Sequence, residues 1–338
     1  MPTDTHNGVS PTLRGRLQRI FTAGPAEQGR PLPLGTRFNY ALWLTRPEIA
    51  PMSGAVMVAD VLFSAHSGAE IWNVTMLVAA LILAVAIQVL HVANCLADRW
   101  VDMEYKSKFA RMVRDLGVRF VAWEVYLMTA FILLGGVYLA WATRHFDLLL
   151  IVPLGTFLLL QYSLPPWHFK SAGFWQIPWT YVATMVFPGL VVLRLYDRPI
   201  EIPALLAILG LGLTLTGIFS VNTAEDLPED AEHEILTSVR ALGLRASFAE
   251  SFTRVCVGAA LVIGGVVAVA GWTWTLIPYA AVLAVVLWYL GSTLVGVWGK
   301  PLEEAMTVVR PRAKLFVVMV ALMGWVTVLP AAAMFAAR

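Results

Sequence analysis

Charged residues are scarce in this chain. Asp, Glu, Lys and Arg make up 14% of its 338 residues, and 59% of the residues are hydrophobic. Soluble domains carry about 25% charged residues. The mean hydropathy of +0.72 points the same way. The composition excludes an ordinary soluble domain and predicts a polytopic membrane protein, while a net charge of +2 gives no reason to expect nucleic-acid binding.

Cysteine and histidine are also rare, with two and six residues. Cys95 and Cys256 lie in or beside apolar segments, and no CxxC pattern occurs, so we expect neither a disulfide nor a zinc site. Residues 1–37 contain no apolar run long enough for a cleavable signal peptide. We expect them to form a flexible cytoplasmic segment, in which residues 13–21 are either a helix on the membrane surface or part of a disordered basic tail.

Long apolar runs fill the rest of the chain, residues 38–338. A helix that crosses a bilayer needs roughly 17–25 such residues. Nine runs meet this length, and they predict an all-α integral membrane domain of nine transmembrane helices around a central cavity. The runs cover residues 47–65, 72–95, 119–142, 146–163, 174–194, 203–222, 250–271, 276–297 and 314–336.

Lysine and arginine are distributed unequally between the two sides that these nine spans define. Twenty of them fall in the N-terminal segment and the even-numbered connections, and four fall on the other side. Cytoplasmic loops carry the excess of positive charge. We therefore expect a cytoplasmic N-terminus and, in a bacterium, a location in the inner membrane.

The second apolar run ends in an unusual polar pattern, HVANCLADRWVD, at residues 91–102. Asn94, Asp98 and Asp102 are four residues apart, so they lie along one face of a helix, about 6 Å apart along its axis. Acidic groups at the end of a membrane helix usually bind a cation or take part in charge transport. A single pattern of this kind is also compatible with a solvated helix end.

The pattern occurs a second time, at the end of the sixth run. In VNTAEDLPED, Asn222, Asp226 and Asp230 repeat the spacing of the first copy. The similarity continues downstream, where VRDLGVR at residues 113–119 is followed by VRALGLR at residues 239–245. Two such copies indicate an internal repeat. By the charge distribution both lie at cytoplasmic ends, so we expect two related halves whose acidic motifs face one site.

Carboxylates brought together in this way repel one another and would take up protons. Two Mg²⁺ ions would remove that repulsion, because Mg²⁺ prefers carboxylate oxygens together with phosphate oxygens of a substrate. The third component is then a diphosphate, which nearby cations would bind. The candidates are Lys106, Lys108, Arg111 and Lys170. A diphosphate at a membrane surface, above apolar helices, suggests a lipid diphosphate with an isoprenoid tail.

These motifs resemble those of the UbiA superfamily of intramembrane prenyltransferases. WLTRP at residues 43–47 is similar to the start of the family's first helix, and YSLPPWHFK at residues 162–170 to its YSxPPxxxK segment. The chain departs from the family at Cys95, where the family has its first aspartate, and at Glu229, where it has a glycine. The first motif is followed by MEYKSKFARMV in place of NxPxRP.

The resemblance implies the Mg²⁺-dependent transfer of a polyprenyl group from its diphosphate to a lipophilic, aromatic acceptor. The metal ligands would be Asn94, Asp98, Asp226 and Asp230. Asp102 would orient a basic residue, Tyr162 would face the allylic cation, and Lys170 would approach the diphosphate.

Two alternatives stay open at this point. Some relatives are terpene cyclases, which use the same ionisation and need no acceptor. A cation transporter would also use intramembrane acids, although transporter sites usually lie near the midplane of the bilayer. The sequence does not identify the acceptor, the length of the prenyl chain or the oligomeric state.

Overall fold

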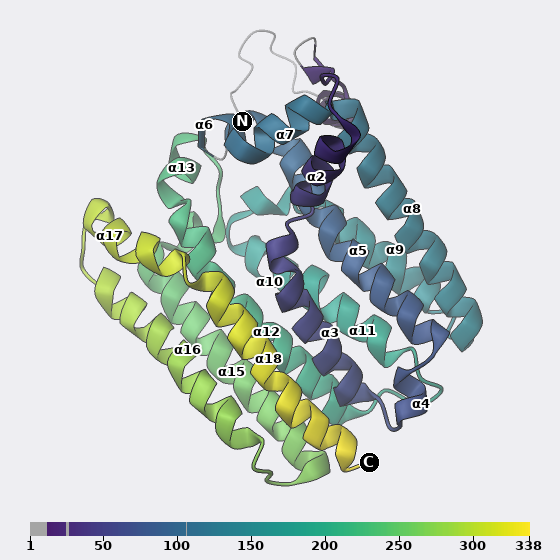
Figure 1. Ribbon diagram of the computed structural model, residues 1–338. Helices are drawn as coiled ribbons and strands as arrows, with labels where there is room; N and C mark the ends of the chain where they lie inside the picture. Colours follow the sequence, from purple (N-terminus) through teal and green to yellow (C-terminus); the bar gives the residue numbers. More distant parts are fainter. Residues whose placement is uncertain (1–11, 25–26, 106) are drawn as a thin grey trace.

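The computed structural model describes residues 12–24, 27–105 and 107–338. Within these ranges the chain forms helices and connecting segments and no strand (Figure 1). Long helices run side by side, and the C-terminus lies at one end of the bundle. Short helices gather at the opposite end, among them α6 (Arg99–Tyr105), α7 (Ser107–Leu116) and α13 (Leu227–Glu232).

Seven helical segments are long and apolar enough to cross a membrane. They are α5 (Val74–Ala97), α8 (Val118–Thr143), the segment Gly173–Leu193 that contains α10 (Gln176–Tyr181) and α11 (Phe187–Leu193), α12 (Ile202–Glu225), α15 (Leu244–Ala270), α16 (Leu276–Val297) and α18 (Phe316–Ala336). The all-α membrane architecture is therefore confirmed, but the expected count of nine spans is not.

The other two expected spans are present as shorter helices. Helix α3 (Ala50–Ser64) has 15 residues and α9 (Leu148–Leu160) has 13. Arg46 adopts a left-handed backbone conformation with φ 56°. It separates the preceding helix, which ends at Leu44, from the 3₁₀ helix Pro47–Ile49 that leads into α3. Two prolines follow α9 in YSLPP, and proline lacks the N–H that would extend the helix.

Most of the hydrophobic core consists of two clusters of buried side chains. One cluster joins α5, α8 and α9 with the N-terminal helices, and the other joins α3 with α12, α15, α16 and α18. Helix α12 is the most enclosed of the seven spans, since 72% of its most apolar 18-residue stretch is buried. Glycines allow it to approach α15 closely, because a Cβ on Gly210 would lie 2.5 Å from the carbonyl oxygen of Gly258.

The internal repeat is visible in the backbone. Helices α5 and α12 have 24 residues each, and Asp98 and Asp226 cap their C-terminal ends with nearly equal dihedral angles (φ −91°, ψ 2° and φ −84°, ψ 3°). After α7 and its counterpart α14 (Ser238–Leu242), the chain turns at Gly117 (φ 90°) and Gly243 (φ 79°). Glycine adopts positive φ without steric cost. The long helices α8 and α15 begin directly after these turns.

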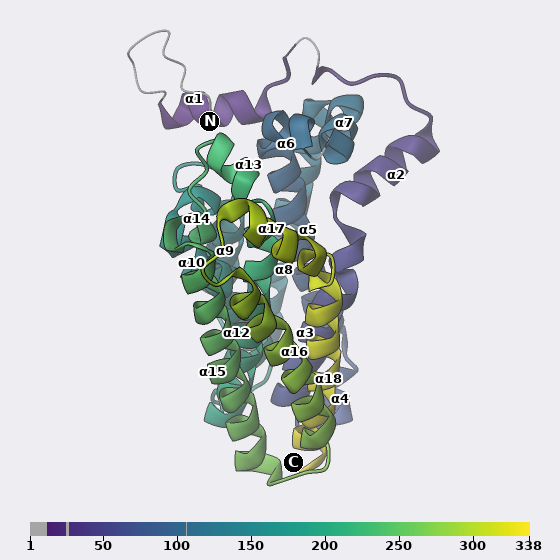
Figure 2. The same cartoon turned by 90° about the vertical axis from the view of Figure 1, so that its left-hand side faces the viewer.

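The N-terminal segment contains two helices, α1 (Leu13–Phe21) and α2 (Leu34–Leu44). Helix α1 lies across the end of the bundle that carries α6 and α13 (Figure 2). The expected flexibility of residues 1–11 and 25–26 concerns positions outside the described residues. Helix α2 runs across the boundary that we expected between residues 37 and 38.

The remaining short helices are α4 (Gly68–Ile71) and α17 (Leu302–Ala313). Helix α4 lies near the end of the bundle that holds the C-terminus, and α17 lies near the other end (Figure 1). The two ends are therefore chemically distinct, because both acidic motifs occur at the end that carries α6, α13 and α17.

Candidate active site

Asn94 and Asp98 form the first part of the candidate site, at the C-terminal end of α5. The Asn94 side-chain amide donates to Asp98 Oδ2 over 2.7 Å and to Ser163 Oγ over 3.0 Å. The four-residue spacing predicted that the two side chains share a helix face, and the hydrogen bond confirms this. Asp102 follows in α6, where its backbone N–H donates to the carbonyl oxygen of Asp98. The three motif residues therefore continue along one helical path.

Lys170 meets the first motif from a distant part of the chain. Its ammonium nitrogen lies 2.5 Å from Asp98 Oδ2. Burial alone lowers the pKa of an ammonium group, but the neighbouring carboxylate of Asp98 outweighs this effect and raises the pKa of Lys170 above its ordinary value. Lys170 is therefore a permanent cation beside Asp98.

The YSLPPWHFK segment positions Lys170 through its own backbone. The N–H groups of Phe169 and Lys170 donate to the carbonyl oxygens of Gln161 and Tyr162, each over 2.9 Å. The Gln161 side chain also accepts from the backbone N–H of Trp167 over 3.2 Å. These bonds fold the segment back on itself, so that Tyr162 and Lys170 stand at neighbouring positions.

Tyr162 is influenced by charges of both acidic motifs. Burial raises the pKa of its hydroxyl above the ordinary value. The Lys170 ammonium group and the hydrogen bond from Gln176 lower this pKa in part, whereas the carboxylates of Asp98 and Asp230 raise it because they disfavour a phenolate nearby. The hydroxyl therefore lies within electrostatic reach of one aspartate from each half. Gln176 donates to this hydroxyl over 3.4 Å and accepts from the backbone N–H of Ser238 over 2.8 Å. Tyr162 is thus tied to the connection that follows the second motif.

The second motif is arranged around α13. Asp226 caps α12, and its carbonyl oxygen accepts from the N–H of Asp230 over 2.8 Å. Asp230 is buried, with 6% of its surface exposed. Leu236 lies in the connection that follows α13, and its carbonyl oxygen accepts a hydrogen bond of 2.7 Å from the N–H of Gly173, three residues after the YSLPPWHFK segment. Residues 162–176, which we call the central segment, therefore contact both the first motif and the connection that follows the second.

The predicted diphosphate-binding cations have different environments. Lys106 lies outside the described residues. The Lys108 ammonium lies 4.0 Å from the centre of the Trp43 ring, and Arg111 is exposed on α7. Of the four, only Lys170 contacts a motif carboxylate within the described part of the chain. Their role in diphosphate binding stays a prediction, because sequence spacing gives no information about the direction of their side chains.

The sequence analysis did not identify two residues beside the motifs, Arg99 and Gln176. Arg99, between Asp98 and Asp102, is only 3% exposed and donates to the carbonyl oxygens of Leu96, Ile20 and Arg19 as well as to Glu27. Its position inside the motif was the available signal, since an arginine that continues an apolar helix requires buried partners. Gln176 was signalled only as a polar residue in an apolar segment.

The donor groups fit Mg²⁺ that shares its coordination with a phosphate. Carboxylate and amide oxygens are its preferred protein ligands. Both hydrogen bonds to the Asp98 carboxylate fall on Oδ2, which leaves Oδ1 as an acceptor. Within the described residues, no three His, Cys, Asp or Glu side chains are grouped closely enough to hold a metal by themselves.

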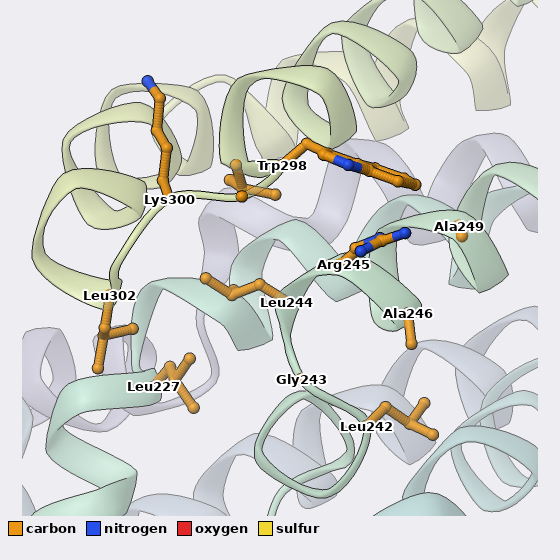
Figure 3. A pocket seen from close by; sticks show the side chains of 12 residues that line it. Leu227, Leu242, Gly243, Leu244, Arg245, Ala246, Ala249, Trp298, Lys300 and Leu302 are labelled. Carbon is orange, nitrogen blue, oxygen red and sulfur yellow. The ribbon is translucent and has the colours of Figure 1, made fainter.

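Two hollows lie near the same end of the bundle. A groove of about 650 Å³ lies between the ends of α15, α16 and α17 (Figure 3), and Arg245, Trp298 and Lys300 are part of its wall. The other, of about 370 Å³, includes Glu27, Arg99 and Trp100. Neither is lined by the motif carboxylates. The expected central cavity stays a prediction.

Comparison with known proteins identifies the architecture. No family model matches the chain, and no curated protein matches it in sequence. A UbiA homologue from Archaeoglobus fulgidus bound to DMAPP and Mg²⁺ has a TM-score of 0.60 at 15% identity, covering 84% of this chain and 98% of that one. A digeranylgeranylglyceryl phosphate synthase structure has a TM-score of 0.62 at 13% identity, covering 88% and 99%.

A third structure extends the comparison. The apo UbiA homologue from Aeropyrum pernix K1 has a TM-score of 0.52 at 16% identity, covering 81% of this chain and 97% of the other. All three likenesses extend over most of the bundle, and the seven apolar helices are those of an integral membrane protein. The chain therefore has the UbiA fold.

Proposed function

We propose that this protein is a prenyltransferase, which moves a polyprenyl group from its diphosphate to a lipophilic, aromatic acceptor with the help of Mg²⁺. The observation that carries the proposal is the pairing of Lys170 with Asp98, beside Tyr162, whose hydroxyl lies within electrostatic reach of Asp98 and of Asp230 from the second half. The fold supports it, since UbiA homologues of the same architecture have been solved with DMAPP or GPP and Mg²⁺.

Asn94, Asp98, Asp226 and Asp230 would hold the metal ions, of which we propose two. The ions would neutralise charge on the diphosphate. Lys170 would donate its N–H bonds to a phosphate oxygen, exchanging its partner Asp98 for the substrate. Asp102, within electrostatic reach of Lys170, would help to keep that ammonium group in place.

The reaction would begin with cleavage of the bond between the allylic carbon and oxygen. The electron pair leaves with the diphosphate, and the allylic group becomes a cation. The ring of Tyr162 would face this cation and stabilise it through its π electrons. A carbon of the acceptor supplies the electrons for the new bond, and the proton that this carbon loses passes to the released diphosphate. The enclosing helices would exclude water, which otherwise captures the cation.

Lys106, Lys108 and Arg111 would act at the rim of the site. Lys108 and Arg111 are exposed at the same end of the bundle as the motifs, so their charge would attract an anionic substrate. We also propose that this end faces the cytoplasm, with residues 1–37 as an N-terminal segment on that side, and that a bacterial host would place the protein in its inner membrane. The excess of Lys and Arg on the motif side supports this orientation.

The test is to supply purified protein with geranyl, farnesyl or geranylgeranyl diphosphate and Mg²⁺, with and without aromatic acceptors of the quinone-precursor or tetrapyrrole type. We expect diphosphate release to be coupled to a prenylated acceptor. Slow formation of the linear alcohol without acceptor is compatible with this, because water captures a stranded cation. A cyclic product formed over many turnovers without acceptor would show a terpene cyclase instead. Mg²⁺-dependent ion flux in vesicles without any diphosphate consumption would show a transporter.

A further inference from the structure

The groove between α15, α16 and α17 is separate from the proposed active site. Its wall consists mainly of apolar side chains, including Leu227, Leu244 and Leu302, together with Arg245, Trp298 and Lys300 (Figure 3). Among the described residues, no acidic side chain lines it. The groove is therefore apolar in its lining and cationic in its charge, which is the chemistry that recognises an anionic amphiphile.

The internal repeat allows the turn beside the groove, at Gly243, to be compared with its counterpart at Gly117. In the first half, the equivalent turn at Gly117 is covered by the N-terminal segment, so that a Cβ on Gly117 would lie 2.8 Å from the carbonyl oxygen of Gln28. Arg30 closes the contact with hydrogen bonds of 2.7 and 2.5 Å to Asp115. In the second half, apart from its chain neighbours, no heavy atom of the described residues lies within 4 Å of a Cβ on Gly243. Ala241 stands in the place of Asp115, so the second turn lacks the acid that would attract a basic segment.

Arg245 has the geometry of an anion-binding side chain. Its guanidinium carbon lies 3.3 Å from the centre of the Trp298 ring, so the indole supports one face of the cation. Stacking of this kind leaves the N–H edge of the guanidinium available for hydrogen bonds. In the part of the chain that the structure describes, Arg245 makes neither an ion pair nor a side-chain hydrogen bond. Lys300 stands on the rim with its ammonium group directed away from Arg245, and adds charge rather than a contact (Figure 3).

The position of the groove at the membrane surface favours a lipid over a soluble anion as its ligand. It lies where α15 begins and α16 ends, both of which are apolar enough to span the membrane. The ends of membrane helices lie at the depth of the lipid headgroups, where tryptophan and basic residues are preferred. Leu244, Leu302 and the exposed Trp298 continue the groove with apolar surface, which suits acyl chains.

We propose that this groove binds an anionic phospholipid of the surrounding bilayer. The lipid phosphate accepts hydrogen bonds from the outer edge of Arg245, and its chains lie against the leucines and Trp298. The site is distinct from that of the prenyl diphosphate, and the proposal does not depend on the enzymatic reaction.

The experiment is native mass spectrometry of the full chain in detergent, with phosphatidylglycerol and phosphatidylcholine of identical acyl chains titrated separately. We expect the first phosphatidylglycerol to bind at least about fivefold more tightly than the first phosphatidylcholine, as one surface cation provides near a headgroup. Arg245→Gln should remove this preference, and Trp298→Leu should reduce it.

Arg119→Gln is the matched control, because Arg119 is the equivalent exposed residue in the first half and lies outside the groove. It should retain the preference of the unmodified protein. Equal loss in Arg119→Gln and Arg245→Gln, or equal affinity for the two lipids, would overturn the proposal. Displacement of phosphatidylglycerol by millimolar inorganic phosphate would also overturn it, because the groove would then bind a phosphate and not a lipid. Size-exclusion profiles of the variants confirm that each one is folded.

Discussion

Lys170 Nζ and Asp98 Oδ2 lie 2.5 Å apart, although 72 positions separate the two residues in the chain. The same oxygen accepts from the Asn94 amide over 2.7 Å. A lysine from the central segment is thus paired with the carboxylate that we propose as a metal ligand. Because a diphosphate carries more negative charge than one carboxylate, we expect the lysine to shift toward the substrate when metal and diphosphate bind together.

Lys170→Gln should lower kcat/KM for the prenyl diphosphate by about tenfold to a hundredfold, the usual value of one charged hydrogen bond. Lys170→Arg keeps the positive charge and should lose less. Steady-state release of diphosphate measures both variants. Unchanged kinetics in Lys170→Gln would remove this residue from the site.

Asp98→Asn and Asp226→Asn should each reduce Mg²⁺-dependent diphosphate release by roughly a thousandfold or more, because a lost carboxylate weakens charge neutralisation on the leaving group. Cys95→Ala is a suitable control. The Cys95 thiol is buried, one residue from Asn94, and its side chain points about 100° away around the helix. Near-normal release by either asparagine variant would contradict the metal assignment.

The two motifs should be reachable from one side of the membrane. Asp98→Cys combined with Asp226→Cys, in a chain whose two natural cysteines are replaced by alanine, should be joined by a short bifunctional thiol reagent. Tyr162 lies within electrostatic reach of one aspartate from each motif, so we expect a short separation. Labelling of the two positions from opposite sides of oriented vesicles would rule out a shared site and the proposed orientation.

Arg99→Gln should release the N-terminal segment from the bundle. The Arg99 guanidinium donates to carbonyl oxygens of α1 and pairs with Glu27 over 2.8 Å, and its removal leaves these buried acceptors without their donor. Trypsin should then cut at the arginines of α1 at least about tenfold faster, since protection follows local stability. Arg114→Gln, on the exposed side of α7, should leave the cleavage rate unchanged. Equal rates in the two variants would show that α1 is held by other contacts.

Glu70 should contribute an acid-sensitive part of the stability. Arg198 donates to both of its carboxylate oxygens over 2.8 and 2.9 Å, and these bonds lower the pKa of Glu70. A carboxylate whose pKa is lower in the folded protein stabilises it above the ordinary value of about 4.5, and this contribution disappears as the pH falls through the folded pKa.

The melting temperature of Glu70→Gln should therefore lie below that of the unmodified protein at pH 7, and the two should converge between about pH 5 and pH 3. Thermal unfolding in detergent across this range measures the difference. A constant gap at every pH would mean that the ion pair has no role in the acid response.

Local features of the chain were predictable from the sequence. Helix position follows from runs of apolar side chains, which is why all nine expected spans are helical in the structure. The spacing of Asn94 and Asp98 placed them on one face because helix geometry depends only on residues a few positions apart. The sequence predicted an internal repeat, and the structure shows equivalent turns at Gly117 and Gly243 within it.

Contacts between distant segments were decided by packing. The sequence offered four lysines and arginines near the motifs, and only the folding of the central segment brings Lys170 to Asp98 while Lys108 rests on Trp43. The sequence did not identify the partners of Arg99, which are carbonyl oxygens of α1 about 80 positions earlier in the chain. The open turn at Gly243 and the covered one at Gly117 have nearly the same local sequence. The sequence by itself thus determined where the helices lie in the chain, their apolar character and the spacing of the motif residues, because these depend on near neighbours. Only the tertiary structure decided which charges meet and which turn stays open, because those depend on what packs above each site.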